Sequence, residues 1–275
     1  VRHFETAGYR PDGLIGTLHA AGATVIHKAS SIRHGLAAER AGADAIALIG
    51  MEEGGHPGLN ELPTMLMGAL AVGQFRVPLV LGGGHEVAWG TFQGVVRARP
   101  QIQRVLVVNF DAHFDLRKAA RGNSGTPFRQ MQEWCASHGI PFDYRVFGIS
   151  RFANTQALFD RADALGVHYV LDDALQSEAG VLQAQAALVH DMAQCDAVYL
   201  TVDLDVLPAG VAPGVSAPAA LGMPLALVER LVDTVLASRK LVAADIAELN
   251  PAFDRDGLTA KVAARLVARM ARGCV

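Results

Sequence analysis

Residues 105–115 read VLVVNFDAHFD, and residues 198–205 read VYLTVDLD. Each stretch begins as an apolar, β-branched run of strand length and ends in carboxylates, with an imidazole at His113 in the first. Runs that are apolar on both faces are typical of parallel strands buried between two layers of helices. Ligands of such sheets gather outside the carboxyl ends of the strands. These stretches therefore predict an α/β fold with a polar site at one edge of its sheet.

Similar apolar runs recur along the chain and alternate with amphipathic segments. The runs typical of strands occupy residues 23–27, 45–49, 78–81, 105–110, 145–149, 167–171, 198–202 and 241–247. Segments with helical spacing occupy residues 157–165, 180–193, 224–237 and 258–272. This alternation predicts a three-layer αβα fold with a mainly parallel central sheet of about eight strands.

Composition limits the class of protein and its partners. A chain of 275 residues, 51% of them hydrophobic, can bury one large core or two small ones. A net charge of −3 gives no basic surface for nucleic acid. No apolar run has the length of a membrane span, and the start carries no signal-peptide pattern. The widely spaced Cys135, Cys195 and Cys274 suit a reducing compartment. We therefore expect a cytoplasmic protein that acts on a small molecule, and a homo-oligomer is compatible with these data.

Carboxylates and imidazoles at the predicted strand ends form a candidate metal site. The six side chains are His85, Asp111, His113, Asp115, Asp203 and Asp205. Alternate residues of an extended segment point to the same side, so the ligands in residues 111–115 and 203–205 face one way. Oxygen-rich donors without thiolate suit Mn²⁺ or Mg²⁺, and six ligands suit two ions that share a carboxylate. The alternative is turn and helix-cap chemistry, but clustered like charges are costly to bury without a cation.

From about residue 78 to the C-terminus, the sequence resembles the ureohydrolase family, which includes arginase, agmatinase and formimidoylglutamase. The matching stretches, in family order, are LGGGHEVAWG (81–90), NFDAHFDLR (109–117), TVDLDVLPAGVAPGVSAP (201–218) and AELNPAFDRDGLTAKVAARL (247–266). The resemblance implies an arginase-like hydrolase with two manganese ions that activate water to attack a guanidino or formimino carbon. It implies that His85, Asp111, Asp115 and Asp203 hold one ion, that Asp111, His113, Asp203 and Asp205 hold the other, and that Asp111 and Asp203 bridge them.

Glu248 follows the predicted strand at residues 241–247 and is a further catalytic candidate. A carboxylate beside the metal site can pair with a cationic amidinium and orient its carbon for attack. The alternative is an ordinary turn carboxylate that faces solvent.

Two loops bear on the substrate. Ser124 stands where arginase and agmatinase carry a proton-shuttling His, and Arg151 follows a strand where arginases carry acids for the substrate's amine. Both features resemble formimidoylglutamase, which implies hydrolysis of N-formimino-L-glutamate to L-glutamate and formamide in histidine degradation. A guanidinium suits that substrate's two carboxylates. The candidate substrate contacts are Arg117, Asn123, Ser124 and Arg151, and each also fits a surface or supporting role.

The first part of the chain resembles a different family. VIHKASSIRHGLAAERAGADAIALIGMEEGGHPG (25–58) is similar to nitronate monooxygenase, an FMN enzyme on a (β/α) barrel, in which the residue matching His56 is a base. The stretch supplies too few strands to enclose a flavin, so we expect no bound FMN. We predict a nitronate-monooxygenase-like segment at 1–77, which completes the sheet or hangs beside it, and a catalytic domain at 78–275. Three alternatives stay open: hydrolysis of another guanidino acid, an FMN oxidoreductase using His56, and an inactive fusion.

Overall fold

The structure is a computed structural model that describes residues 2–7, 12–29, 31–48, 79–81 and 83–272. Its larger sheet contains five strands: β5 (Val105–Phe110), β6 (Asp143–Ile149), β7 (His168–Leu171), β8 (Ala197–Asp203) and β9 (Leu241–Ala247). Their order across the sheet is β7-β6-β5-β8-β9, and every neighbouring pair is parallel. β5 and β8 are buried along their whole length, which explains why both sequences are apolar on both faces.

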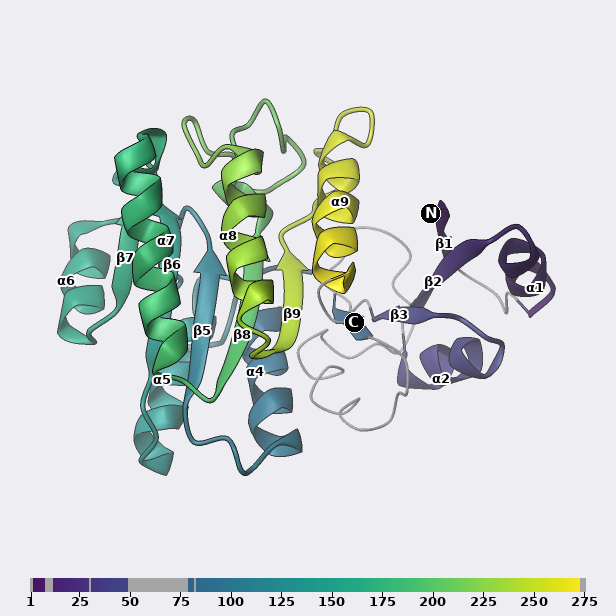
Figure 1. The fold of residues 1–275 in the computed structure, drawn as a ribbon, viewed down its shortest axis with the longest axis horizontal. Helices are drawn as coiled ribbons and strands as arrows, with labels where there is room; N and C mark the ends of the chain where they lie inside the picture. Colours follow the sequence, from purple (N-terminus) through teal and green to yellow (C-terminus); the bar gives the residue numbers. More distant parts are fainter. Residues whose placement is uncertain (1, 8–11, 30, 49–78, 82, 273–275) are drawn as a thin grey trace.

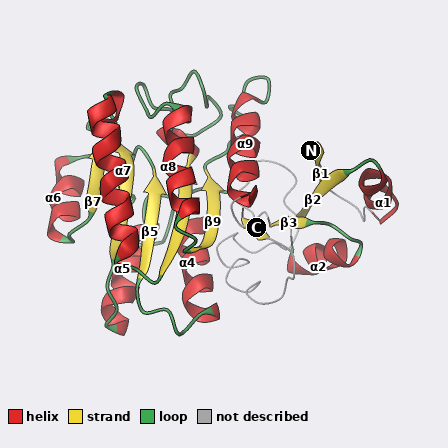
Figure 2. Cartoon of the chain, in the orientation of Figure 1, coloured by secondary structure: helices red, strands yellow, loops and turns green. Residues whose placement is uncertain are grey.

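Helices cover both faces of the larger sheet (Figures 1 and 2). One core lies against α4 (Val87–Ala98), α5 (Pro127–His138) and α6 (Gln156–Ala164). The other lies against α7 (Glu178–Ala193), α8 (Leu225–Ala237) and α9 (Leu258–Arg272). The predicted three-layer αβα architecture is confirmed for this part of the chain. Among the described residues, no helix combines the length and the apolarity needed to cross a membrane.

A second sheet is built from the first part of the chain. It contains β1 (Arg2–Ala7), β2 (Ala23–Ala29), β3 (Ala45–Leu48) and β4 (Leu79–Leu81), in that order and all parallel. The helices α1 (Asp12–Ala20) and α2 (Ile32–Arg40) connect its first three strands. The prediction of a single sheet of about eight strands is not confirmed, because β4 pairs with β3 and the described strands form one sheet of four and one of five.

The two sheets nevertheless meet in one place. The backbone N–H of Glu248, just after β9, donates to the carbonyl of Gly83, just after β4, at 2.9 Å. A small apolar core under this contact joins Ile46 and Leu48 of β3 to Val87 of α4 and Ala247 of β9. The N-terminal strands thus lie beside the β9 edge of the larger sheet, and their core includes Val87, two residues after His85 (Figure 1).

Candidate metal centre

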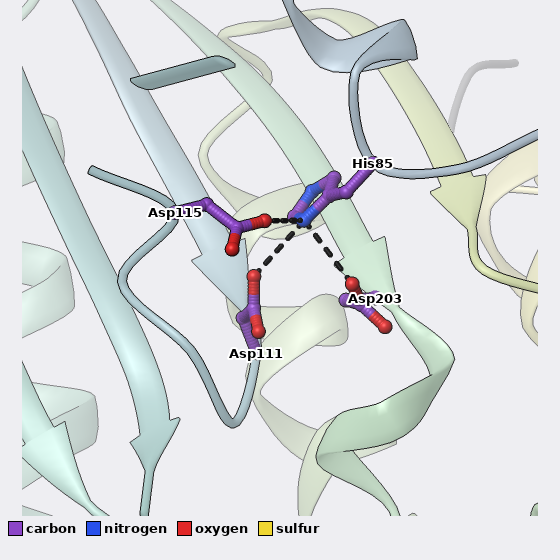
Figure 3. Close-up of side chains that lie close together, drawn as sticks. All are labelled: His85, Asp111, Asp115 and Asp203. Atoms are coloured by element: carbon purple, nitrogen blue, oxygen red, sulfur yellow. Dashed lines mark hydrogen bonds and ion pairs between the residues drawn. The ribbon is translucent and has the colours of Figure 1, made fainter. Parts of the chain in front are cut away.

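Four predicted ligands converge at the carboxyl ends of the strands. The Nδ1 atom of His85 lies 2.9 Å from an Asp111 oxygen, 3.0 Å from an Asp115 oxygen and 3.2 Å from an Asp203 oxygen. These side chains point toward one another from three separate segments of the chain (Figure 3). All four residues are buried, and one ligand atom from each lies within 4.8 Å of the others. The structure therefore brings together the first predicted ligand group.

A second group adjoins the first and shares Asp111 with it. His113 Nδ1 lies 2.9 Å from Asp205 Oδ2 and 3.5 Å from Asp111 Oδ1. The group formed by these three residues again has ligand atoms within 4.8 Å of one another. Among the described residues, Asp203 belongs to the first group only, so its role as a bridge between two ions stays a prediction.

Local hydrogen bonds hold the Asp111–Asp115 loop in its shape. The His113 N–H donates to Asp111 Oδ1 at 2.6 Å, and the Phe114 N–H donates to Asn154 Oδ1 at 3.1 Å. The Asn154 amide also donates to the Ala112 carbonyl at 2.8 Å. Asp115 has a φ of 49°, a left-handed conformation that costs a non-glycine residue roughly 1–3 kcal/mol. In this conformation the Asp115 carboxylate lies 3.0 Å from His85 Nδ1.

The pKa values of several side chains in the cluster are shifted from their ordinary values. Burial alone would lower the pKa of His85, but hydrogen bonds with Asp111, Asp115 and Asp203 raise it well above its ordinary value. Burial and then the charge of Asp111 raise the pKa of Asp115 to about 7. Burial and the charge of Asp205 raise the pKa of Asp203 well above its usual range. The carboxylates therefore repel each other in a site with little solvent to screen them.

The donor set fits a pair of divalent cations. Four carboxylates and two imidazoles meet here, and within the described residues the two histidines are the only ion-pair partners of the carboxylates. Buried carboxylates that face one another are stabilised by a cation between them. Oxygen-rich ligands with imidazole nitrogen, and without thiolate, match Mn²⁺ or Mg²⁺ better than a zinc site rich in cysteine.

Glu248 lies beside the first ligand group, in agreement with its predicted place at the end of β9. Its Oε1 accepts the His85 backbone N–H at 3.0 Å, and its Oε2 accepts the Ser216 hydroxyl at 3.0 Å. Glu248 has a φ of 68°, so its backbone is also strained. A Cβ atom at Gly84 would overlap Glu86 Oε2 and lie 3.1 Å from Glu248 Oε1, so a side chain there would displace the Glu86 carboxylate. The Glu248 carboxylate is thus fixed in orientation.

The four predicted substrate contacts lie on the loops after β5 and β6. Arg117 and Arg151 are exposed, and neither takes part in an ion pair among the described residues. The Arg117 side chain lies against Gly125. The Asn123 side-chain oxygen accepts the Gly125 N–H at 3.0 Å and so stabilises the loop itself. Ser124 is half-buried. The role of these four residues in substrate binding stays a prediction. His56 lies outside the described residues.

Sequence reasoning missed a polar layer beneath the ligands. Asn109, Thr201 and Asp245 are register partners on β5, β8 and β9, and all three are buried. Asn109 Nδ2 donates to Asp111 Oδ2 at 3.0 Å, and Thr201 Oγ1 lies 3.1 Å from His85 Nε2. A signal was present, because Tyr199, Thr201 and Asp203 alternate along an otherwise apolar strand and so share a face.

Comparison with known proteins agrees with this geometry. Residues 63–272 match the family described as "Arginase family", and residues 4–88 match the family described as "Nitronate monooxygenase". A formimidoylglutamase of Ralstonia nicotianae is 54% identical over 220 residues, a match that covers 78% of this chain and 66% of that protein. The corresponding match to a Paraburkholderia xenovorans formimidoylglutamase covers 63% of that protein, so the chain spans slightly less than two thirds of these relatives.

Two solved structures show the same fold at lower identity. The arginase of Bacillus caldovelox superposes with a TM-score of 0.65 at 20% identity and covers 94% of this chain and 88% of its own. The formiminoglutamase of Trypanosoma cruzi, whose structure was determined with Mn²⁺, superposes with a TM-score of 0.63 at 22% identity and covers 76% and 69%. The match to the Bacillus caldovelox arginase covers more of this chain than the match to the Trypanosoma cruzi enzyme does.

Proposed function

Because this chain belongs to the arginase family, we propose that it hydrolyses an amidine C–N bond with the help of two manganese ions. The substrate that fits best is N-formimino-L-glutamate, which water converts to L-glutamate and formamide. The observation that carries this proposal is the buried meeting of four carboxylates and two imidazoles at the strand ends. The named activity of relatives at 54% identity supports the choice of substrate.

In the proposed site, each ligand group holds one ion. His85, Asp111, Asp115 and Asp203 would hold the first, and Asp111, His113 and Asp205, with Asp203 as a second bridge, would hold the other. When bound, two such cations would lower the pKa of water at the site and so supply a nucleophile near neutral pH.

Glu248 would bind the amidinium of the substrate. Its carboxylate is held by the His85 N–H and the Ser216 hydroxyl, so it presents a fixed negative charge beside the ligand groups. Pairing with that charge aligns the formimino carbon for attack. Water then forms a bond from its oxygen to this carbon, the bond from the carbon to the glutamate nitrogen breaks, and the leaving nitrogen takes up a proton.

Specificity would come from the loops after β5 and β6. N-formimino-L-glutamate carries two carboxylates, and a guanidinium offers each a bidentate partner. Arg151 and Arg117 supply exposed guanidinium groups that have no ion-pair partner among the described residues. Asn123 and Ser124 border the same loop and would contact the substrate through polar atoms.

We assign the first 77 residues a supporting role in the same fold. The pairing of β3 with β4 and the small core shared with α4 and β9 support this assignment. The segment would complete the arginase-like layer that backs the metal site. We also place the protein in the cytoplasm, where the buried thiols of Cys135 and Cys195 stay reduced.

The direct test combines metal analysis with product detection. The purified chain should bind two manganese ions and release formamide from N-formimino-L-glutamate, whereas arginine should be a poor substrate. Asp111→Ala should remove both ions because Asp111 belongs to both groups, and His85→Ala should weaken mainly one. The matched control Asp160→Ala removes an exposed carboxylate on α6 and should keep both ions. Two ions without turnover would reject the substrate, and no bound manganese would reject the proposal.

A further inference from the structure

A chain of buried polar groups runs from His85 away from the ligand cluster. His85 Nε2 lies 3.1 Å from Thr201 Oγ1, and Tyr199 precedes Thr201 by two residues on β8, so the two side chains share one face of the strand. The Tyr199 hydroxyl lies 2.7 Å from Asp245 Oδ2, which also accepts the Thr91 hydroxyl at 2.6 Å. Thr201 and Tyr199 are fully buried, and Asp245 is 5% exposed.

The donor and acceptor capacity of each group fixes which one donates in each hydrogen bond of this series. A cation bound among the carboxylates that face His85 Nδ1 requires an unprotonated Nδ1, so the ring proton lies on Nε2 and is donated to Thr201. Thr201 then accepts at its oxygen and keeps its own proton for donation to Tyr199. Asp245 only accepts as a carboxylate, so Tyr199 donates to it. Burial first, and then the charge of Asp245, raise the pKa of Tyr199 well above its ordinary value, so this donor stays protonated.

We propose that Thr201, Tyr199 and Asp245 form a relay that sets the tautomer and orientation of His85 and thereby tunes the affinity of one of the two metal positions. Metal-binding histidines commonly donate their second ring N–H to a carboxylate or carbonyl, which fixes the ring and raises its basicity. Here the carboxylate is reached through two hydroxyls. These three are positioning residues, because none belongs to either ligand group.

A purely structural role explains the arrangement less well. A buried carboxylate is costly, and apolar residues of similar size usually replace such groups without loss of stability. Both hydrogen bonds to the Asp245 carboxylate reach Oδ2, whereas its Oδ1 has no hydrogen-bond partner among the described residues, so the carboxylate is only partly satisfied. The strand register sets Thr201 directly beside Asp245, and Thr201 Oγ1 lies 3.1 Å from the His85 ring nitrogen.

The experiment measures manganese affinity, and not turnover alone. Apo-protein is titrated with Mn²⁺ by calorimetry, and electron paramagnetic resonance follows whether spin-coupled pairs or isolated ions form. Thr201→Val keeps the shape but removes the acceptor, and Tyr199→Phe breaks the relay one step further on. Thr201→Ser restores the hydroxyl. Thr234→Val, which removes a threonine hydroxyl from α8, is the control outside the site.

We expect Thr201→Val to weaken one manganese position by roughly 10–100-fold and leave the other within a few-fold, so that one equivalent gives the spectrum of isolated ions. Tyr199→Phe should show a smaller loss at the same position, while Thr201→Ser and Thr234→Val should match the parent. Equal weakening of both positions, no weakening, or a Ser variant as poor as Val would overturn the relay. The inference rests on the proposed two-ion site: a parent that binds no manganese refutes that site, whereas an intact parent with an unaffected Val variant refutes the relay alone.

Discussion

Leu48→Ala tests whether the N-terminal strands belong to the catalytic fold. Leu48 is fully buried at the end of β3, opposite Leu81 of β4, in the core that includes Val87 and Ala247. If this core is part of one cooperative unit, shortening Leu48 must destabilise the whole protein. If the first sheet only hangs beside the second, the loss is confined to the first sheet.

The size of the effect follows from what the substitution removes. Losing about three methylene equivalents at ~0.8 kcal/mol each, plus a cavity contribution of about 1 kcal/mol, gives roughly 3 kcal/mol. With an unfolding entropy of ~2.1 cal/mol/K per residue over 275 residues, each degree corresponds to about 0.6 kcal/mol. The Tm should therefore fall by about 5 °C.

The two tryptophans make the assay selective. Trp89 lies on α4 and Trp134 on α5, so tryptophan fluorescence reports unfolding of the part that covers the larger sheet. We expect the fluorescence transition and the far-ultraviolet circular dichroism transition to shift together in Leu48→Ala. Leu14→Ala truncates a leucine that is 51% exposed on α1 and should shift neither. A fluorescence transition that stays in place while the dichroism signal splits would refute a single cooperative unit.

Three further substitutions test the site and the helix layer. Glu248→Gln should retain both ions but lower kcat/KM by roughly 30–1,000-fold, about 2–4 kcal/mol for a lost charge pair; formamide release within a few-fold of the parent would reject Glu248 as the orienting carboxylate. Arg151→Ala should raise KM for N-formimino-L-glutamate by about tenfold, ~1.4 kcal/mol, with metal content unchanged. The effect is modest because solvent partly screens an exposed guanidinium. Unchanged kinetics would assign substrate binding to other residues. Hydrogen bonds from Arg265 lower the pKa of Glu229. The ionised carboxylate therefore stabilises the fold at pH values above the ordinary pKa of glutamate, and this stabilisation is lost as the pH falls through the lowered pKa. The Tm difference between the parent and Glu229→Gln should thus be present at neutral pH and shrink in acid, and a difference that grows in acid would contradict the linkage.

The carboxylates of the site could be predicted because they depend on local rules. Asp111, Asp115, Asp203 and Asp205 follow apolar strands, and side-chain alternation predicts that each pair faces one way. The structure places them together, as expected. Glu248 could be placed for the same reason, since it follows β9 directly.

The supporting layer and the sheet division depend on information that one sequence lacks. Thr201 and Asp245 become partners only through the register of β8 against β9, and neither stretch encodes that register alone. The choice of β4 to pair with β3 depends on tertiary contacts around a strand of only three residues. β1 was missed because its sequence, RHFETA, mixes charged and apolar residues and shows no run of strand character.

The matches to the two families overlap at residues 63–88, which include β4, its glycines and His85. A recombination crossover inside this stretch, just before β4, would exchange the segment that precedes β4. The orientation of the His85 side chain would stay unchanged. Such an exchange would have to keep the register of β4, because a shift of one residue turns the side chains of a strand to the opposite face. In such a hybrid protein the hydrogen bond between Gly83 and Glu248 would join the two exchanged parts. Natural selection would therefore act first on the residues around this contact.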